Sequence, residues 1–208
     1  MPGWIRAALL ITAVLAVAVG IAFARGQNRR ARMGGPMARP KQIWLIWAVY
    51  TWFFATPLFA MSPALSTPLR TVLGAFSILM IARGVVEVVM LYVTKSWRPP
   101  YGIAHDVLCA AVLLSGSAWV VFGGSPLDDP IEAWGRGLLA ALTVSLLLET
   151  YYAVSFHRAV DGRTTGDDGV WFATADDPRF ARVVLVTSIA NIPLVAFVLG
   201  LLAWVGLA

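Results

Sequence analysis

Residues 83 to 106 read RGVVEVVMLYVTKSWRPPYGIAHD and join the end of one long apolar run to the start of the next. Arg83 and Glu87 stand four residues apart inside the first of these runs, which is long enough to cross a membrane. A charged side chain at the centre of a bilayer costs about 2.5–3.5 kcal/mol on insertion scales. Both charges therefore need partners inside the protein.

Six such runs occur along the chain, each with about the 20 residues that a helix needs to cross a hydrocarbon core. We expect helices at about 4–24, 43–61, 69–94, 104–122, 134–156 and 181–206. The chain is 59% hydrophobic and 13% charged, whereas a soluble domain is about one quarter charged. The runs are continuous rather than alternating, which argues against barrel strands. The sequence predicts one all-α domain over residues 1–208, a polytopic membrane protein built as a six-helix bundle.

The basic residues predict the orientation of this bundle. The connections 25–42, 95–103 and 157–182 share one side and hold twelve of the 16 Lys and Arg residues. By the positive-inside rule they face the cytoplasm, so both termini lie outside it. We expect a multi-pass protein of a cell membrane, the inner membrane of a bacterium. The first run also ends in a cleavage-like Ala22-Phe23-Ala24. Whether it is removed as a signal stays open, although the charge count favours a retained helix.

The same distribution explains the net charge of +5 without nucleic acid as a partner. The single cysteine, Cys109, excludes a disulfide within the chain. Between the third and fourth runs, Pro99-Pro100-Tyr101-Gly102 predicts a short rigid turn. His105 and Asp106 would then open the fourth helix, where a carboxylate is favourable to the helix dipole.

Polar residues in three of the runs fall at similar depths. At about 1.5 Å per residue from the expected cytoplasmic helix ends, Glu87 and Glu149 lie roughly 10 Å deep and Asn191 roughly 12 Å deep. Ser145, Glu149 and Tyr152 share one helix face. We therefore expect a ligand site inside the bundle formed by Arg83, Glu87, Glu149, Asn191 and Tyr152, with a mouth lined by His105, Asp106 and His157.

Several functions fit this cluster. The first is binding of a small polar or amphipathic ligand from the cytoplasm, with transfer coupled to a proton. The second is a metal-dependent enzyme acting on a lipid or quinone-like substrate, because carboxylates and imidazoles bind zinc or iron. Its ligands would be Glu87, His105, Asp106, Glu149 and His157, although the E-x-x-H and H-x-x-x-H spacings are absent.

Three further interpretations remain. His105 and His157 could be axial ligands of a haem. The charges could instead serve helix packing, with an Arg83–Glu87 ion pair and a protonated Glu149. A chain with so little mass outside its apolar runs could also be a non-catalytic subunit of a larger membrane complex or a homo-oligomer, with lipid around it. The sequence leaves the ligand, any catalysis, the transport direction and the oligomeric state open.

Overall fold

A computed structural model describes residues 2–30, 37–94, 96, 99–123, 129–160 and 178–207, and every regular element within these ranges is a helix. Six helical segments among them are long and apolar enough to cross a membrane: Gly3–Ala22, Arg39–Ala60, Thr67–Val88, Pro100–Phe122, Pro130–Ala159 and Pro178–Leu207. The prediction of six long apolar helices and no strands is confirmed for the described residues. Much of the basic connections (31–36, 95, 97–98 and 161–177) lies outside them, and the orientation relative to the cytoplasm stays a prediction.

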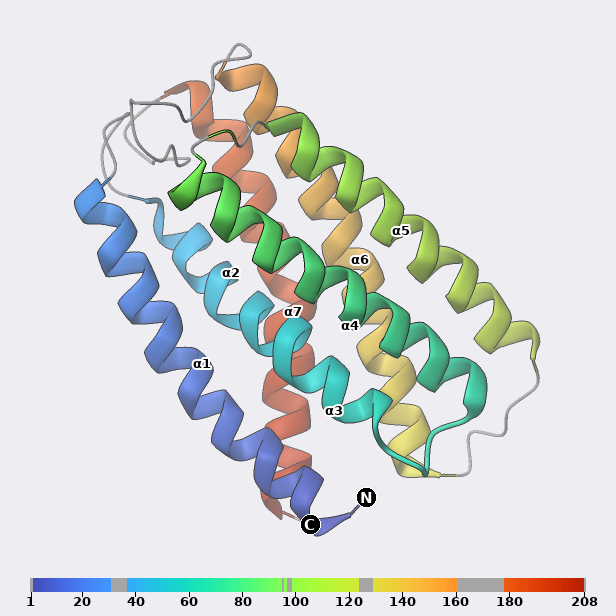
Figure 1. Ribbon diagram of the computed structural model, residues 1–208. Coiled ribbons are helices and arrows are strands. Elements are labelled where there is room, and N and C mark those ends of the chain that lie inside the picture. The colour runs from blue at the N-terminus through green and yellow to red at the C-terminus, as the bar shows by residue number, and fades with distance from the viewer. Residues whose placement is uncertain are drawn as a thin grey trace.

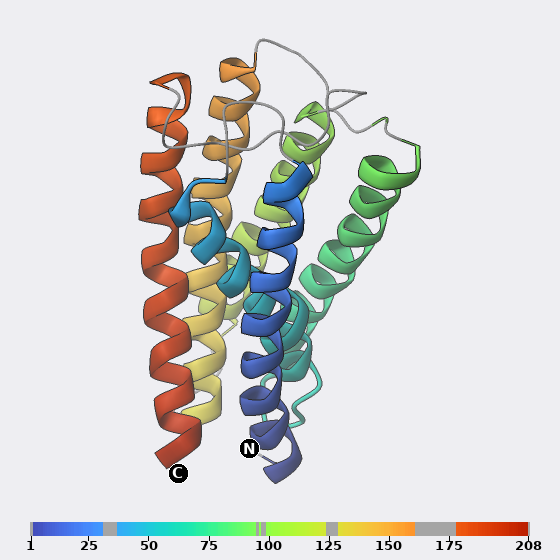
Figure 2. The same ribbon diagram turned by 90° about the vertical axis from the view of Figure 1, so that its left-hand side faces the viewer.

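The segments form one bundle of helices that run up and down in turn (Figures 1 and 2). The α-helices are α1 (Gly3–Arg30), α2 (Arg39–Tyr50), α3 (Thr56–Ala60), α4 (Thr67–Val88), α5 (Pro99–Phe122), α6 (Pro130–Ala159) and α7 (Ala181–Leu207). Shorter pieces are the π-helical turns η1 (Thr51–Ala55) and η2 (Val89–Val93) and the 3-10 turn η3 (Pro178–Phe180).

The ends of the chain meet because α7 packs against both α2 and α6 and also touches α1. The start of α1 and the end of α7 lie at the same end of the bundle (Figure 1). Arg6 donates a hydrogen bond to the Val205 carbonyl oxygen at 3.0 Å, which ties these two helices together. The N-terminal turn of α2 lies toward the opposite end of the bundle, where it contacts α6 through Glu149 and α7 through Asn191.

The second segment is interrupted by a π-helical turn. Pro57 has no N–H to give to the helix ladder, and the Thr56 N–H bonds to the Thr51 carbonyl five residues back. Such one-turn π-helices change the direction in which the following side chains point, and they occur often at functional sites. Here Trp52, in η1, meets Trp44 edge to face with ring centroids 5.0 Å apart.

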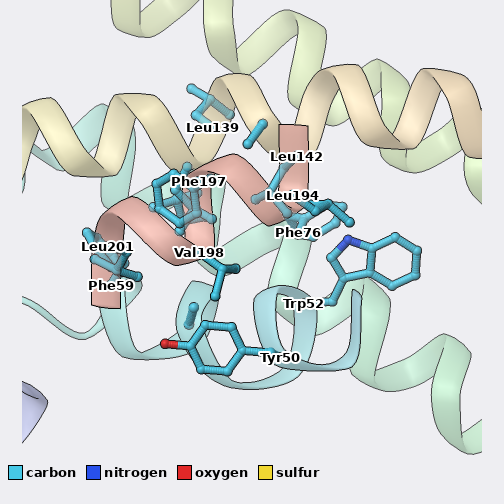
Figure 3. Packing of buried hydrophobic residues seen from close by; sticks show 14 of the residues in the cluster. Tyr50, Trp52, Phe59, Phe76, Leu139, Leu142, Leu194, Phe197, Val198 and Leu201 are labelled. Carbon is cyan, nitrogen blue, oxygen red and sulfur yellow. The ribbon is translucent and has the colours of Figure 1, made fainter. Parts of the chain in front are cut away.

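The main core lies in the half of the bundle away from the described start of α2. Aromatic and aliphatic side chains of α2, η1, α3, α4, α6 and α7 interlock there, among them Tyr50, Trp52, Phe59, Phe76, Leu142, Leu194 and Phe197 (Figure 3). Small residues allow close approach of neighbouring helices, as is usual where packing rather than water drives association. A Cβ added to Gly116 of α5 would collide with Val72 of α4.

Several helices begin earlier than the apolar runs predict, and the starts of α5 and α2 change the position of charged residues. The expected turn at Pro99–Gly102 is wrong, because α5 begins at Pro99. The backbone N–H groups in the first turn of a helix have no carbonyl acceptor within that helix. Proline, which lacks this N–H, is therefore accommodated there. The expectation that His105 and Asp106 open this helix is therefore also wrong, since Asp106 lies seven residues inside it.

The start of α2 differs in the same direction. The sequence predicts a helix from residue 43 and places Lys41 in a basic connection, but α2 begins at Arg39 with Pro40 in its first turn. Lys41 is consequently a helix residue, and it is buried. A hydropathy pattern ends a predicted span at a charged residue. In the structure the Lys41 ammonium group is buried because it forms an ion pair within the bundle.

The half of α4 that follows Met80 is loosely packed. From Ile81 through η2, no residue whose side chain the structure describes is buried. Figure 2 shows this half leaning away from α1 and α7 toward the end of the bundle where α2 begins. Arg83 and Glu87 belong to this half, so they lie at the margin of the bundle rather than on its axis.

Candidate functional site

Glu149 projects from the buried face of α6. Its helix buries Leu138, Leu142, Ser145, Tyr152 and Phe156 at spacings of three and four residues, and Glu149 falls on the same line. Only 5% of the residue is exposed. The expected face shared by Ser145, Glu149 and Tyr152 is confirmed. A carboxylate in such surroundings requires a positive partner or a proton.

The partner is Lys41, from the first turn of α2. Its Nζ donates to Glu149 Oε1 at 3.0 Å, and the residue is 8% exposed. The side chains join segments 108 positions apart in the sequence. Buried ion pairs of this kind contribute little net stability, but the loss of one partner leaves an uncompensated charge.

Two aromatic rings enclose the same ammonium group. Lys41 Nζ lies 3.7 Å from the ring centroid of Trp44 and 3.8 Å from that of Tyr152. Both distances are well inside the range of about 6 Å for a cation–π interaction. Trp44 follows Lys41 by three residues on α2, so helix geometry places its ring beside the lysine. Lys41 is therefore held by one carboxylate and two π faces.

Asn191 of α7 completes this group from a third helix. Its Nδ2 donates to the Pro40 carbonyl oxygen at 2.9 Å, which fixes the first turn of α2 against α7. We call the set of Lys41, Trp44, Ser145, Glu149, Tyr152 and Asn191 the Lys41–Glu149 site.

Three oxygen atoms of this site are buried without a hydrogen-bond partner among the described residues. They are Glu149 Oε2, Asn191 Oδ1 and Ser145 Oγ, and the Trp44 indole Nε1 of the same site is likewise buried without a partner there. Buried polar atoms are nearly always hydrogen-bonded, since an unsatisfied one costs about 1–3 kcal/mol. Because these oxygens gather around one ion pair, they indicate a site where a ligand could donate hydrogen bonds to the protein.

A second group of charges lies on α4 and α5. Arg83 donates through Nε to Glu87 at 3.0 Å and through Nη1 to Asp106. Asp106 is fully buried, whereas the Glu87 side chain is 30% exposed. We call these three residues the Arg83 cluster. Because α5 begins at Pro99, Asp106 lies about 10 Å inside its helix, level with Glu87.

The structure thus forms two groups where the sequence predicts one site of Arg83, Glu87, Glu149 and Asn191. Glu149 pairs with Lys41, and Arg83 pairs with the acids of its own cluster. The physical reason for the difference is that a lysine from the helix start reaches Glu149.

The two histidines lie elsewhere. His105 on α5 contacts the Leu79 carbonyl through Nε2 at 3.0 Å and the Cys109 sulfur through Nδ1 at 3.4 Å. His157 lies near the end of α6, and its Nδ1 is buried without a partner among the described residues. No three His, Cys, Asp or Glu side chains in the described ranges come close enough together to hold a metal ion. Glu87, His105, Asp106, Glu149 and His157 therefore do not assemble into one metal-binding group there.

A third buried acid, Glu132, serves a structural purpose at the opposite end of the bundle. It accepts hydrogen bonds from the backbone N–H and the hydroxyl of Ser66, at 2.9 and 2.8 Å, and it pairs with Arg136 on its own helix. Ser66 precedes the first turn of α4, so Glu132 holds the start of that helix against α6. Glu132 gives a matched reference for Glu149: a buried glutamate with both oxygens bonded.

The residues that sequence reasoning missed are Lys41 and Trp44. Lys41 stands at the edge of a basic segment, where a role in orientation explains it, and Trp44 is one of nine tryptophans. One signal was present in the sequence: proline is favoured at the start of a helix, so Pro40 could have indicated that a helix begins there and includes Lys41. No sequence pattern near Lys41 or near Glu149 indicates that these two residues form an ion pair.

Comparison of the chain with protein-family models, with curated proteins and with solved structures finds no match.

Proposed function

We propose that this chain is a multi-pass membrane protein, with both termini outside the cytoplasm, that binds a small polar or amphipathic ligand at the Lys41–Glu149 site and transfers it together with a proton. The observation that carries the proposal is the set of three unsatisfied buried oxygens around one buried ion pair. Ionisable groups inside a membrane segment are expensive and are functional candidates for that reason.

The placement of Lys41 supports access from the cytoplasm. It is the third residue of α2, which begins within the predicted basic connection 25–42. The positive-inside rule assigns that connection to the cytoplasm. A ligand that enters there meets Lys41 before it meets Glu149, which lies ten residues from the end of α6.

The ion pair also offers a simple route for a proton. Transfer of one proton from the Lys41 ammonium to the Glu149 carboxylate converts the charged pair into a neutral amine and a carboxylic acid. Neither form leaves a net charge in the buried site. Both forms hold the same number of protons, so this transfer alone exchanges none with the solvent. A cationic ligand that pairs with Glu149 while Lys41 loses its proton to the solvent would release one proton on binding.

The experiment compares two buried glutamates. The purified protein in lipid nanodiscs is heated with n-propylammonium chloride, sodium propionate or β-alanine, and unfolding is followed by tryptophan fluorescence. We expect at least one probe to raise Tm in a saturable manner. Glu149→Gln should abolish this shift, and Glu132→Gln, with its acid at the other end of the bundle, should retain it. Equal loss in both variants, or no shift with any probe, would refute the proposal.

A role as a subunit is the second candidate, and one observation favours it. The half of α4 from Ile81 onward has no buried side chain among those described, and valines at positions 85 and 88 are 62% and 55% exposed. A helix from a second chain could pack there. The native mass of the protein extracted in a mild detergent tests this: a single chain without a partner would argue against it.

A further inference from the structure

The Lys41–Glu149 site already contains an ammonium ion, supplied by the chain itself. The Lys41 Nζ has Glu149 Oε1 at 3.0 Å and the Trp44 and Tyr152 rings at 3.7 and 3.8 Å. Aromatic faces attract the cations of side chains and of ligands alike, and a carboxylate beside them accepts a charge-assisted hydrogen bond from an ammonium group. Lys41 therefore occupies the position that such a ligand would take.

The remaining polar atoms favour a donor of hydrogen bonds over an acceptor. Glu149 Oε2 and Asn191 Oδ1 can only accept, Ser145 Oγ can do either, and Trp44 Nε1 can only donate, so acceptors outnumber donors among the unsatisfied atoms. The residues that carry them are at least nine-tenths buried. A carboxylate or phosphate ligand would add further acceptors to this group. A primary ammonium brings three N–H donors that are free to turn toward these oxygens.

The lysine is also the more easily displaced half of the pair. It lies in the first turn of α2, and its four-carbon stem can carry the ammonium toward the helix end and the lipid headgroups without any change in the helix. Glu149 lies in the interior of α6 and has no such exit. Exchange of one monovalent cation for another also leaves the net charge of the buried site unchanged.

We infer that the ligand class of this site is a primary organic ammonium ion, which displaces Lys41 from Glu149, Trp44 and Tyr152, so that Lys41 is a tethered occupant of a cation-binding site. This inference rests on the proposed function and specifies its ligand. The tether prevents the acid from being buried without a cation when the ligand is absent.

The test uses n-propylammonium chloride, which matches the end of a lysine side chain, against sodium propionate and sodium chloride at equal ionic strength. In the wild-type protein we expect a saturable rise in Tm with n-propylammonium and none with the two sodium salts. Lys41→Ala should bind the same probe about tenfold more tightly or better, because the wild-type site is free of its tether for only a fraction of the time. Lys41→Ala/Glu149→Gln should show no shift.

The outcomes distinguish a failure of the ammonium inference from a failure of the proposed function. A propionate shift that requires Lys41 and Glu149, without an n-propylammonium shift, would overturn the ammonium inference and leave the proposed function standing. No Glu149-dependent shift with any probe would overturn both. The wild-type measurement alone decides the inference if Lys41→Ala does not fold. A tetramethylammonium shift as large as that of n-propylammonium would overturn the argument from the unsatisfied oxygens, since that ion has no N–H donor.

Discussion

Replacement of Lys41 by methionine leaves Glu149 in the bundle without the cation that holds it. Both side chains are largely buried, with exposed fractions of 11% for Lys41 and 6% for Glu149. Removal of one member of a buried ion pair costs about 3–5 kcal/mol. Methionine keeps most of the stem volume and its contact with Trp44 and Tyr152, so the lost charge and hydrogen bond account for most of the change. We expect Lys41→Met to lower the free energy of unfolding by about 3–5 kcal/mol.

The double variant Lys41→Met/Glu149→Gln distinguishes the interaction energy of the ion pair from the separate effect of each substitution. It removes both charges and leaves one buried amide, which costs about 1–3 kcal/mol if unsatisfied. The double variant should therefore be more stable than Lys41→Met alone. The assay is titration of the protein in mixed micelles with SDS, followed by far-UV circular dichroism. Additive losses, with a coupling below about 0.5 kcal/mol, would refute the contact.

Two further predictions concern the rest of the bundle and use the same assay. Arg83→Gln should cost about 3–5 kcal/mol because it leaves Asp106 buried and charged, and Asp106→Asn in the same chain should restore much of the loss; an unchanged stability of Arg83→Gln would contradict the Arg83 cluster. Gly116→Ala should cost about 1–3 kcal/mol by forcing α4 and α5 apart. Val72→Ala should relieve it, and Gly206→Ala, where an added Cβ meets nothing within 4 Å, should be neutral; equal effects at both glycines would contradict this packing.

The helices could be predicted from the sequence because their signal is local. Each apolar run is long enough to cross a membrane, and its length requires no knowledge of its neighbours. The helix starts could not be placed from the same signal. Prolines at 40 and 99 look like chain breaks in a hydropathy pattern, but they stand in first turns, where a missing N–H costs nothing.

The candidate site was predictable in part for a related reason. Glu149 and Tyr152 share a face with buried leucines of α6, and that face follows from the helix period alone. The identity of the partner does not follow, because Lys41 and Glu149 are 108 positions apart and meet only through the packing of α2 against α6 and α7. The depth of each residue along its helix places Glu87 level with Glu149. Depth does not show which basic residue of a neighbouring helix pairs with either carboxylate.

The proposed ligand site depends on the contact between Lys41 and Glu149, and solid-state NMR in lipid bilayers tests this contact directly. Lys41 and Lys95 are the two lysines of the chain, so a Lys95→Arg variant with 15N-lysine and 13C-glutamate reports on the Lys41 Nζ alone. That nitrogen lies 3.0 Å from Glu149 Oε1, which places it within about 4 Å of the carboxyl carbon.

We predict a strong nitrogen–carbon dipolar coupling at the lysine amine signal. It should disappear in Glu149→Gln and persist in Glu132→Gln. An amine signal without this coupling, or a coupling that survives Glu149→Gln, would contradict the account.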